Sequence, residues 1–294
     1  MKSLDIGFIG LGVMGSPMAG HLARAGHSLT LLDANPSAAK QLAQALGGPV
    51  RAVRTPREVA EASDIVITML PNGHAVQTVA LGEDGLVHGL RRDAALLDTS
   101  SSEPWLTQQT AKTVAERGAT MVDAAVSGAE AGAKGAELVF MVGGSDQDVA
   151  RVRPLLEVMG RSVFHLGPLG SGHAMKCINN CMIIAATAEG LVAGKRYGLD
   201  PMKMIDVLNL STGGSWVTRT QFQSVFNRQF DVSFKLALML KDIGIAVDLA
   251  ADTSTPVRCG VSGSSCGAWR ITPPARGPAS ARSCDGSRSR QAPS

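Results

Sequence analysis

Short apolar runs alternate with longer stretches of mixed polarity through the first half of the chain. The runs are DIGFIG (5–10), SLTLLD (28–33), DIVITML (64–70), AALLD (94–98), TMVDA (120–124) and LVFMVGG (138–144). The stretches between them, such as PSAAKQLAQALG and PWLTQQTAKTVAERG, have the spacing of helices. Strands that are apolar throughout and alternate with helices are typical of a parallel sheet covered on both faces. The pattern therefore predicts a doubly wound α/β domain over residues 1–167.

The strand pattern ends after HLGPLGSG (165–172), and the chain up to residue 257 then has the spacing of helices. Residues 173–196 contain no proline, which predicts a helix of about 24 residues, or roughly 36 Å at 1.5 Å per residue. Asp200 followed by Pro201 is a helix start with a capping side chain, and residues 233–252 form another strongly apolar helix. We therefore expect an all-helical second domain over residues 168–257, entered through one long helix.

Residues 258–294 differ in composition from everything before them. They contain no Leu, Lys or Glu, but eight Ser, six Arg, five Gly and four Pro. Such a composition cannot bury an apolar core, so it predicts disorder. A GC-rich gene translated in the wrong frame yields the same composition, which suggests the hypothesis that this tail is an out-of-frame product. Under that hypothesis the helical domain loses apolar partners, and we expect a poorly stable protein with reduced activity.

Charge and cysteine content narrow the class of protein. The net charge of +3 arises in the tail, where six Arg and one Asp give +5, so residues 1–257 carry −2 and offer no basic surface for nucleic acid. No apolar run reaches the roughly eighteen residues of a membrane span, and the amino terminus lacks a signal-peptide pattern, which favours a cytoplasmic protein. Cys177 and Cys181 have no His or carboxylate at ligand spacing, so we expect reduced thiols and no metal site.

A glycine-rich turn joins the first strand to the helix that follows it. Gly10, Gly12 and Gly15 form GxGxxG, and Asp33 ends the second strand 23 residues after Gly10. This context is that of the Rossmann dinucleotide fingerprint, in which the glycines allow a tight turn, an approach to the pyrophosphate and close helix–strand packing. Asp33 would accept hydrogen bonds from the ribose hydroxyls and repel a 2′-phosphate, and no Arg follows it directly. We therefore expect NAD as the cofactor in preference to NADP.

An enzyme that oxidises an alcohol with a nicotinamide needs a group that takes the hydroxyl proton at the working pH. The six histidines give no strong candidate. Lys176 is the better one, because burial and the positive end of the helix dipole, near the start of the long helix, lower the pKa of an amine. A lysine whose ammonium reaches water is the commoner arrangement. Asn179 and Asn180 nevertheless follow at i+3 and i+4 on the same helix face, so these polar groups need partners or a ligand.

Six motifs in order resemble the β-hydroxyacid dehydrogenase family, which includes 3-hydroxyisobutyrate dehydrogenase and tartronate semialdehyde reductase. They are GFIGLGVMG, MLPNG, DTSSSEP, DAAVSGA, GSGHAMKCINN and LKDIGIA, and the resemblance extends from about residue 2 to residue 256. It implies that Lys176 is the catalytic acid/base and that Asn180 assists it. It implies a substrate site at Ser127, Gly128, Ala129 and Asn180, in which Ser127 and the backbone of Gly128 bind the substrate carboxylate. It implies a cofactor site at Gly10, Leu11, Gly12, Val13, Met14, Gly15, Asp33, Leu70, Pro71, Ser101 and Lys241.

These features predict an oxidoreductase that transfers a hydride between NAD and a short 3-hydroxyacid of the 3-hydroxyisobutyrate type, or the matching semialdehyde. In the intact family we expect a homodimer or homotetramer. Tartronate semialdehyde reduction is an alternative, although Trp216 resembles the 3-hydroxyisobutyrate branch more. An inactive nucleotide-binding relic is another, because of the tail. Two departures, Ala125 in place of the family's usual Pro and Ala129 in place of a common Gly, predict a narrower anion pocket.

Overall fold

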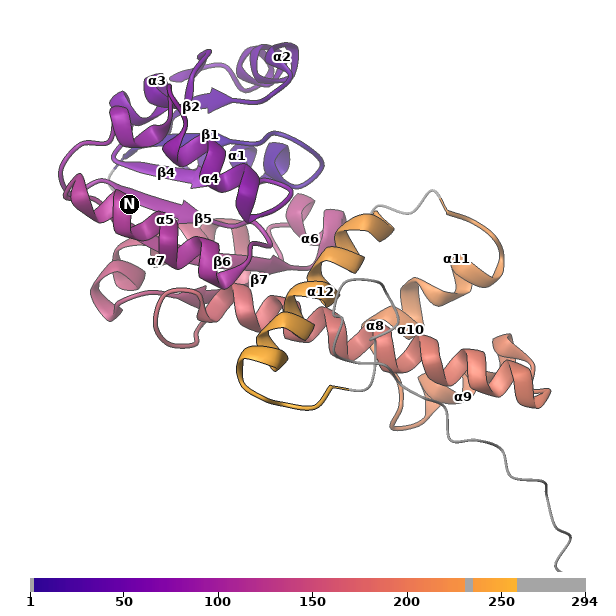
Figure 1. Cartoon of the computed structure of the whole chain (residues 1–294). Coiled ribbons are helices and arrows are strands. Elements are labelled where there is room, and N and C mark those ends of the chain that lie inside the picture. The colour runs from indigo at the N-terminus through magenta and orange to yellow at the C-terminus, as the bar shows by residue number, and fades with distance from the viewer. Residues whose placement is uncertain (1–2, 231–234, 258–294) are drawn as a thin grey trace, which may run out of the picture. The chain divides into compact units, whose positions relative to one another are not determined.

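The protein is described by a computed structural model that covers residues 3–230 and 235–257. Its amino-terminal part is built on an eight-stranded sheet with the order β3-β2-β1-β4-β5-β6-β7-β8 (Figure 1). The strands are β1 (Asp5–Ile9), β2 (Ser28–Leu32), β3 (Val50–Ala52), β4 (Ile65–Thr68), β5 (Ala95–Asp98), β6 (Thr120–Ser127), β7 (Leu138–Gly143) and β8 (Gly160–His165). The predicted doubly wound Rossmann-type domain is confirmed.

One pair of neighbouring strands departs from the predicted parallel arrangement. Strands β6 and β7 pair antiparallel, with Asp123 opposite Gly143 and Ser127 opposite Val139, whereas the other six pairs are parallel. Only residues 128–137 connect these two strands. That connection is shorter than the dozen or more residues that a parallel crossover requires, so the chain turns back on itself instead.

Two strands, β3 and β8, were absent from the predicted set because both lie at edges of the sheet. Strand β3 has only three residues, none of them fully buried, and most of β8 is partly or wholly exposed. An edge strand needs no continuous apolar run, so the pattern that marks the inner strands is missing from its sequence.

Alternate residues of the inner strands face two separate apolar cores. Ile65 and Ile67 of β4 belong to one core, and Val66 between them belongs to the other. The first core is covered by α1 (Gly15–Arg24), α2 (Pro36–Leu46), α6 (Ala129–Lys134) and α7 (Asp146–Met159), and the second by α3 (Pro56–Glu61), α4 (Gly73–Leu81), η1 (Leu86–His88) and α5 (Pro104–Glu116). Burial on both faces explains why these strands are apolar throughout.

After β8 the described chain is helical, as predicted. The helices are α8 (Ser171–Tyr197), α9 (Pro201–Leu210), α10 (Trp216–Thr220), α11 (Phe222–Phe226) and α12 (Leu236–Asp252). Asp200 caps α9 by accepting a hydrogen bond from the backbone N–H of Lys203 at 3.0 Å, and Pro201 is its first residue. The predicted start of the last helix at Ser233 and the predicted disorder of residues 258–294 both lie outside the described residues.

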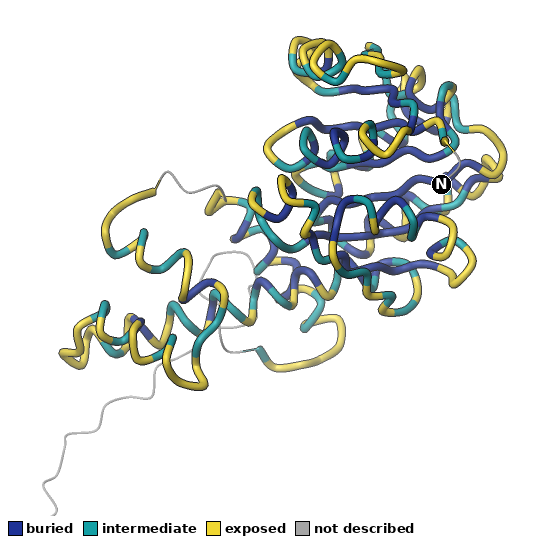
Figure 2. The backbone as a smooth tube through the Cα atoms, turned by 180° about the vertical axis from the view of Figure 1, so that it is seen from behind, coloured by how far each residue is buried: buried dark blue, intermediate teal, exposed yellow. Residues whose placement is uncertain are grey.

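Helix α8 is the one helix within the described ranges that is long and apolar enough, by length and composition alone, to cross a membrane. Its first half nevertheless packs against β6, β7 and α12 and buries His173, Lys176 and Asn180. Figure 2 shows the buried backbone concentrated in the sheet, while the second half of α8 and α9 are mostly exposed or intermediate. Over the 18-residue apolar window of α8 as a whole, 28% is buried inside the protein.

Candidate active site

The glycine turn after β1 has the shape that a dinucleotide requires. Gly10 has φ +96°, and a Cβ atom there would clash with the carbonyl oxygen of Met69. A Cβ on Gly15 would clash with the carbonyl oxygen of Gly10, so α1 can start this close to the turn only without a side chain. A Cβ on Gly12, in contrast, would have no protein atom within 4 Å. The glycine that the protein's own packing does not need therefore faces the space that a pyrophosphate would fill.

Asp33 lies at the carboxyl end of β2, beside this turn. Its Oδ2 accepts a hydrogen bond from the backbone N–H of Leu11 at 2.6 Å, and its Oδ1 accepts one from the N–H of Asn35 at 2.8 Å. A carboxylate has about four acceptor positions, so two donors leave room for ribose hydroxyls. Val13 is 55% exposed at the tip of the turn, and no described side chain caps α1, although the N–H of Ser16 already donates to the carbonyl oxygen of Gly12 at 3.1 Å and Pro17 has no N–H. These residues fit a bound NAD.

The remaining predicted cofactor residues are Leu70 and Pro71 after β4, Ser101 after β5, and Lys241 in α12. A Cβ on Gly10 would lie 3.0 Å from the side chain of Leu70, which follows β4, and the N–H of Leu70 donates to Ser100 Oγ at 2.8 Å. Pro71 is exposed beside Leu70. Lys241 of α12 donates a hydrogen bond from its Nζ to the carbonyl oxygen of Ser101. Helix α12 is thereby tied to the turn that follows β5.

Lys176 lies one and a half turns into α8 with 8% of its surface exposed. Burial removes water from the ammonium group and lowers the pKa of Lys176, while the negative charge of Asp242 opposes this shift. The same burial raises the pKa of the neighbouring Cys177 to about 12, so this thiol stays protonated at neutral pH. Of this pair, Lys176 is thus the group whose pKa is moved toward neutrality and Cys177 the one whose pKa is moved away from it.

Asp242 joins the predicted residues Asn180 and Lys241. Asn180 Nδ2 donates to Asp242 Oδ2 at 2.7 Å, and Lys241 Nζ lies 3.0 Å from Asp242 Oδ1. Sequence reasoning missed Asp242, although a signal was present. Within α12 the buried positions are Met239, Asp242, Ile245 and Ala246, so a carboxylate occupies a core-facing position of an apolar helix. A charge at such a position needs a partner, which here is supplied by α8 and by Lys241.

Asn179, which was expected to share the face of Lys176 and Asn180, is less buried than either. Its Nδ2 lies 3.3 Å from Asn180 Oδ1. Asn180 is oriented by Asp242, because a carboxylate only accepts hydrogen bonds and so the amide nitrogen must point toward it. The side-chain oxygen of Asn180 therefore points away from Asp242, accepts from Asn179 Nδ2, and keeps one acceptor position for a second donor.

The predicted substrate loop follows β6. Gly128 has φ +135° and Ala129 has φ +52°, a left-handed conformation that a residue with a side chain adopts only with strain. Ala125 is fully buried within β6 and pairs with Met141 of β7, so it is a residue of the sheet and not of the loop that follows it. Within residues 3–230 and 235–257, no hydrogen bond or ion pair joins Ser127 or Gly128 to Lys176 or Asn180. The substrate loop and the Lys176–Asn180 pair are brought near each other by their elements, because α8 packs against β6.

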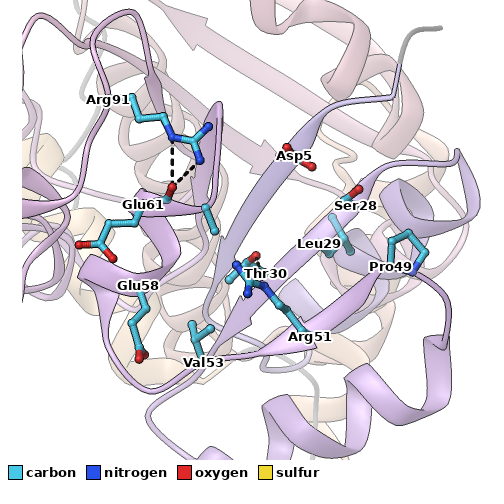
Figure 3. Close-up of a pocket in the computed structure, with 11 residues that line it drawn as sticks. Asp5, Ser28, Leu29, Thr30, Pro49, Arg51, Val53, Glu58, Glu61 and Arg91 are labelled. Atoms are coloured by element: carbon cyan, nitrogen blue, oxygen red, sulfur yellow. Dashed lines mark hydrogen bonds between the residues drawn. The ribbon is translucent and has the colours of Figure 1, made fainter.

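The hollow in Figure 3, with a volume of about 560 Å³, lies away from these residues. Asp5 and Ser28, the first residues of β1 and β2, line it, so it opens toward the amino ends of these strands, and the cofactor residues lie at their carboxyl ends. Arg91 donates from Nε to the carbonyl oxygen of Glu61 at 3.1 Å, and Arg51 Nε donates to Thr30 Oγ1 at 3.3 Å. The charged groups here are engaged in the packing of α3 and the sheet edge.

Comparison with known proteins identifies the family. Residues 5–167 match the model of the NAD-binding domain of 6-phosphogluconate dehydrogenase, and residues 170–266 match that of the NAD-binding domain of NADP-dependent 3-hydroxyisobutyrate dehydrogenase. The chain is 37% identical over 266 residues to 3-hydroxyisobutyrate dehydrogenase of Pseudomonas aeruginosa, covering 86% of this chain and 88% of that protein. The chain belongs to the β-hydroxyacid dehydrogenase family. The resemblance drawn from the six motifs is confirmed.

Other members of the family support the same class of chemistry. A 2-(hydroxymethyl)glutarate dehydrogenase of Eubacterium barkeri is 36% identical over 263 residues, covering 87% of this chain and 85% of that protein. The structure of Mycobacterium tuberculosis 3-hydroxyisobutyrate dehydrogenase with L-serine matches with a TM-score of 0.76 at 34% identity, covering 88% of this chain and 90% of that one. The chain is therefore an NAD(P)-dependent oxidoreductase of hydroxyacids, and the comparisons favour neither alternative, tartronate semialdehyde reductase or inactive relic.

Proposed function

We propose that this β-hydroxyacid dehydrogenase oxidises a short 3-hydroxyacid of the 3-hydroxyisobutyrate type with NAD, or reduces the matching semialdehyde, and that Lys176 moves the proton. The observation that supports this most directly is the buried amine of Lys176, whose pKa burial lowers in the direction that a general acid/base requires. Relatives at 36–37% identity that act on 3-hydroxyisobutyrate and 2-(hydroxymethyl)glutarate point to a hydroxymethyl group beside a carboxylate-bearing carbon.

In the direction of oxidation, the neutral amine of Lys176 takes the hydroxyl proton of the substrate, and in reduction the ammonium returns it. Bound NAD supplies the hydride acceptor. Asn180, held by Asp242, presents its carbonyl oxygen to the substrate hydroxyl or to the Lys176 ammonium. Asp242 also raises the pKa of Lys176, which partly offsets the effect of burial.

The remaining binding roles belong mainly to residues at or just after the carboxyl ends of the strands. The backbone after β6, at Ser127, Gly128 and Ala129, holds the substrate carboxylate through N–H donors. The turn from Gly10 to Gly15 holds the pyrophosphate, Asp33 selects NAD over NADP, and Leu70, Pro71, Ser101 and Lys241 line the nicotinamide half. We further propose the domain boundaries 1–167 and 168–257, a cytoplasmic location, and assembly as a homodimer or homotetramer.

A substrate panel with the purified full chain tests the proposal. The panel contains 3-hydroxyisobutyrate, serine, threonate and tartronate semialdehyde, each assayed with both NAD and NADP in the appropriate redox form. We expect the highest kcat/KM for 3-hydroxyisobutyrate with NAD. A higher kcat/KM for tartronate semialdehyde would assign the chain to that branch, and NADH binding without turnover on any compound would contradict catalysis.

A further inference from the structure

The first turn of α8 is capped by a side chain from the sheet. Gly170, the residue before the helix, has no side chain to cap it. Asp123 of β6 takes this place, since its Oδ1 accepts from the N–H of Gly170 at 2.7 Å and its Oδ2 accepts from the N–H of His173 at 2.8 Å. Asp123 is completely buried. A carboxylate at a helix amino terminus is favoured by the helix dipole, so this contact fastens α8 to β6 at one point.

His173 fastens the same turn to two further elements. Its Nδ1 lies 2.8 Å from Thr107 Oγ1 of α5, and the Thr107 hydroxyl also lies 3.2 Å from the carbonyl oxygen of Glu103. The side chains of His173 and Thr107 share a hydrogen bond, whose donor depends on the tautomer of the imidazole. On its other side, His173 Nε2 faces Asp98 Oδ2 of β5 at 3.5 Å. His173 and Asp98 are both completely buried.

Asp98 extends the cluster to the turn that carries Ser101. Its Oδ1 accepts from Thr68 Oγ1 at 2.9 Å and from the N–H of Ser100 at 3.0 Å, and its Oδ2 accepts from Ser102 Oγ at 2.8 Å. The carbonyl oxygen of the neighbouring Ser101 accepts a hydrogen bond from Lys241 Nζ. One buried set of polar side chains therefore fixes both the helix of Lys176 and the contact point of α12.

Two glycines allow the parts to lie this close together. A Cβ on Gly172 of α8 would clash with the carbonyl oxygen of Met141, and a Cβ on Gly143 of β7 would clash with Asp123 Oδ1. Buried carboxylates and a buried imidazole give little net stability compared with apolar packing. They do, however, restrict the geometry, because the hydrogen bonds of Asp123 and Asp98 are directional, whereas His173 Nε2 faces Asp98 without a hydrogen bond.

From these contacts we propose that Asp123 and His173 are positioning residues for Lys176. Lys176 follows His173 by three residues, less than one helical turn, so the height and rotation of the first turn of α8 decide where the amine lies. The inference rests on the proposed role of Lys176 as the acid/base. The cluster acts through the helix, since Asp123 and His173 are both completely buried, Asp123 bonds to the first turn of α8, and His173 is part of that turn.

Conservative substitutions separate positioning from simple stabilisation. Asp123→Asn keeps the shape of the side chain but replaces one acceptor oxygen by a donor, so it cannot accept from both Gly170 and His173. We expect kcat to fall at least tenfold, the inflection of kcat/KM with pH that belongs to Lys176 to move, and the Kd for NADH to stay within twofold. Asp200→Asn, the same change at the exposed cap of α9, is the matched control and should leave kcat unchanged.

Variants of the His173–Thr107 bond provide a second test that does not depend on Asp123→Asn folding. Thr107→Val and His173→Leu remove the bond and should lower kcat, whereas Thr107→Ser and His173→Asn keep an acceptor and a donor at these positions and should restore most of it. Variants that change only thermal stability, with kcat and the pH inflection within twofold of wild type, would overturn the proposal. A Lys176→Ala variant that stays active would instead overturn the role of Lys176 itself, so the two failures are distinguishable.

Discussion

Lys176 is the residue whose energetics depend most on its surroundings, because a buried amine destabilises the folded state while it is charged. Its pKa is lowered from the ordinary 10.5, first by burial, so between the lowered value and 10.5 the unfolded chain binds more protons than the folded one. Stability then rises with pH across this window. The penalty is fully present below the folded pKa and is lost as the pH approaches 10.5.

Lys176→Met should therefore stabilise the protein near pH 7. Methionine has a similar length and no charge, so it removes the burial penalty, which amounts to about 1.4 kcal/mol for each unit by which the pKa is lowered. The gain in the free energy of unfolding should shrink as the pH is raised toward 10. Denaturant unfolding of both proteins at several pH values measures it. A Met variant that is less stable than wild type at pH 7 would show that the amine is not penalised by burial.

Asp33 is expected to decide between the two nicotinamide cofactors. The double substitution Asp33→Ser with Ala34→Arg replaces a repulsive carboxylate by a partner for the 2′-phosphate, so kcat/KM with NADP should rise relative to NAD. Ala34→Arg alone is the control, because it adds the positive charge and keeps the carboxylate. A wild-type protein that already prefers NADP would contradict this role of Asp33.

Residues whose role depends on their neighbours in the sequence could be predicted, and residues whose role depends on a partner far away in the sequence were harder to find. Gly10 and Gly15 follow from the GxGxxG pattern, and Lys176 follows from a charge in an apolar helix. Asp242 was missed although its core-facing position in an apolar helix was a local signal, because its partner Asn180 lies 62 residues earlier in the chain. His173 was set aside, since nothing in its neighbourhood indicates that Thr107 and Asp98 would surround it.

At the scale of elements, Gly15 is needed for the packing of α1 against the glycine turn, whereas we expect Gly12 to be needed only for cofactor binding. Gly15→Ala places a Cβ against the carbonyl oxygen of Gly10, so helix and strand must separate. Gly12→Ala meets no protein atom. We expect Gly15→Ala to lower both the thermal stability and NADH affinity, and Gly12→Ala to lower NADH affinity by at least tenfold with little change in stability.

Thermal unfolding and NADH titration of the two variants measure this difference. If Gly12→Ala bound NADH as tightly as wild type, the open space beside Gly12 would not belong to the pyrophosphate.

The inner strands were predictable because burial on both faces makes them apolar throughout. The edges β3 and β8 and the antiparallel turn at β7 were not, since they depend on strand order and connection length rather than on a local pattern.

At the scale of the whole molecule, the matches to the two family models cover residues 5–167 and 170–266. The second match extends nine residues past Val257, where the change of composition begins. Residues 258–294 lie outside the described residues, and their origin in another reading frame stays a hypothesis. Resequencing the gene around codon 257, together with the intact mass of the purified protein, tests it. A confirmed sequence whose tail is ordered and packs on the helices would contradict it.

The central claim is that Lys176 carries the proton in this dinucleotide-binding enzyme, and steady-state kinetics of Lys176→Ala test it most directly. Lys195→Ala, an exposed lysine near the end of the same helix, is the control and should behave as wild type. We predict that Lys176→Ala loses at least about 100-fold in kcat, as removal of a general acid/base ordinarily does. Its Kd for NADH should stay within about threefold, because the turn at Gly10–Gly15 is untouched. Retention of more than about a tenth of the wild-type kcat would contradict the claim.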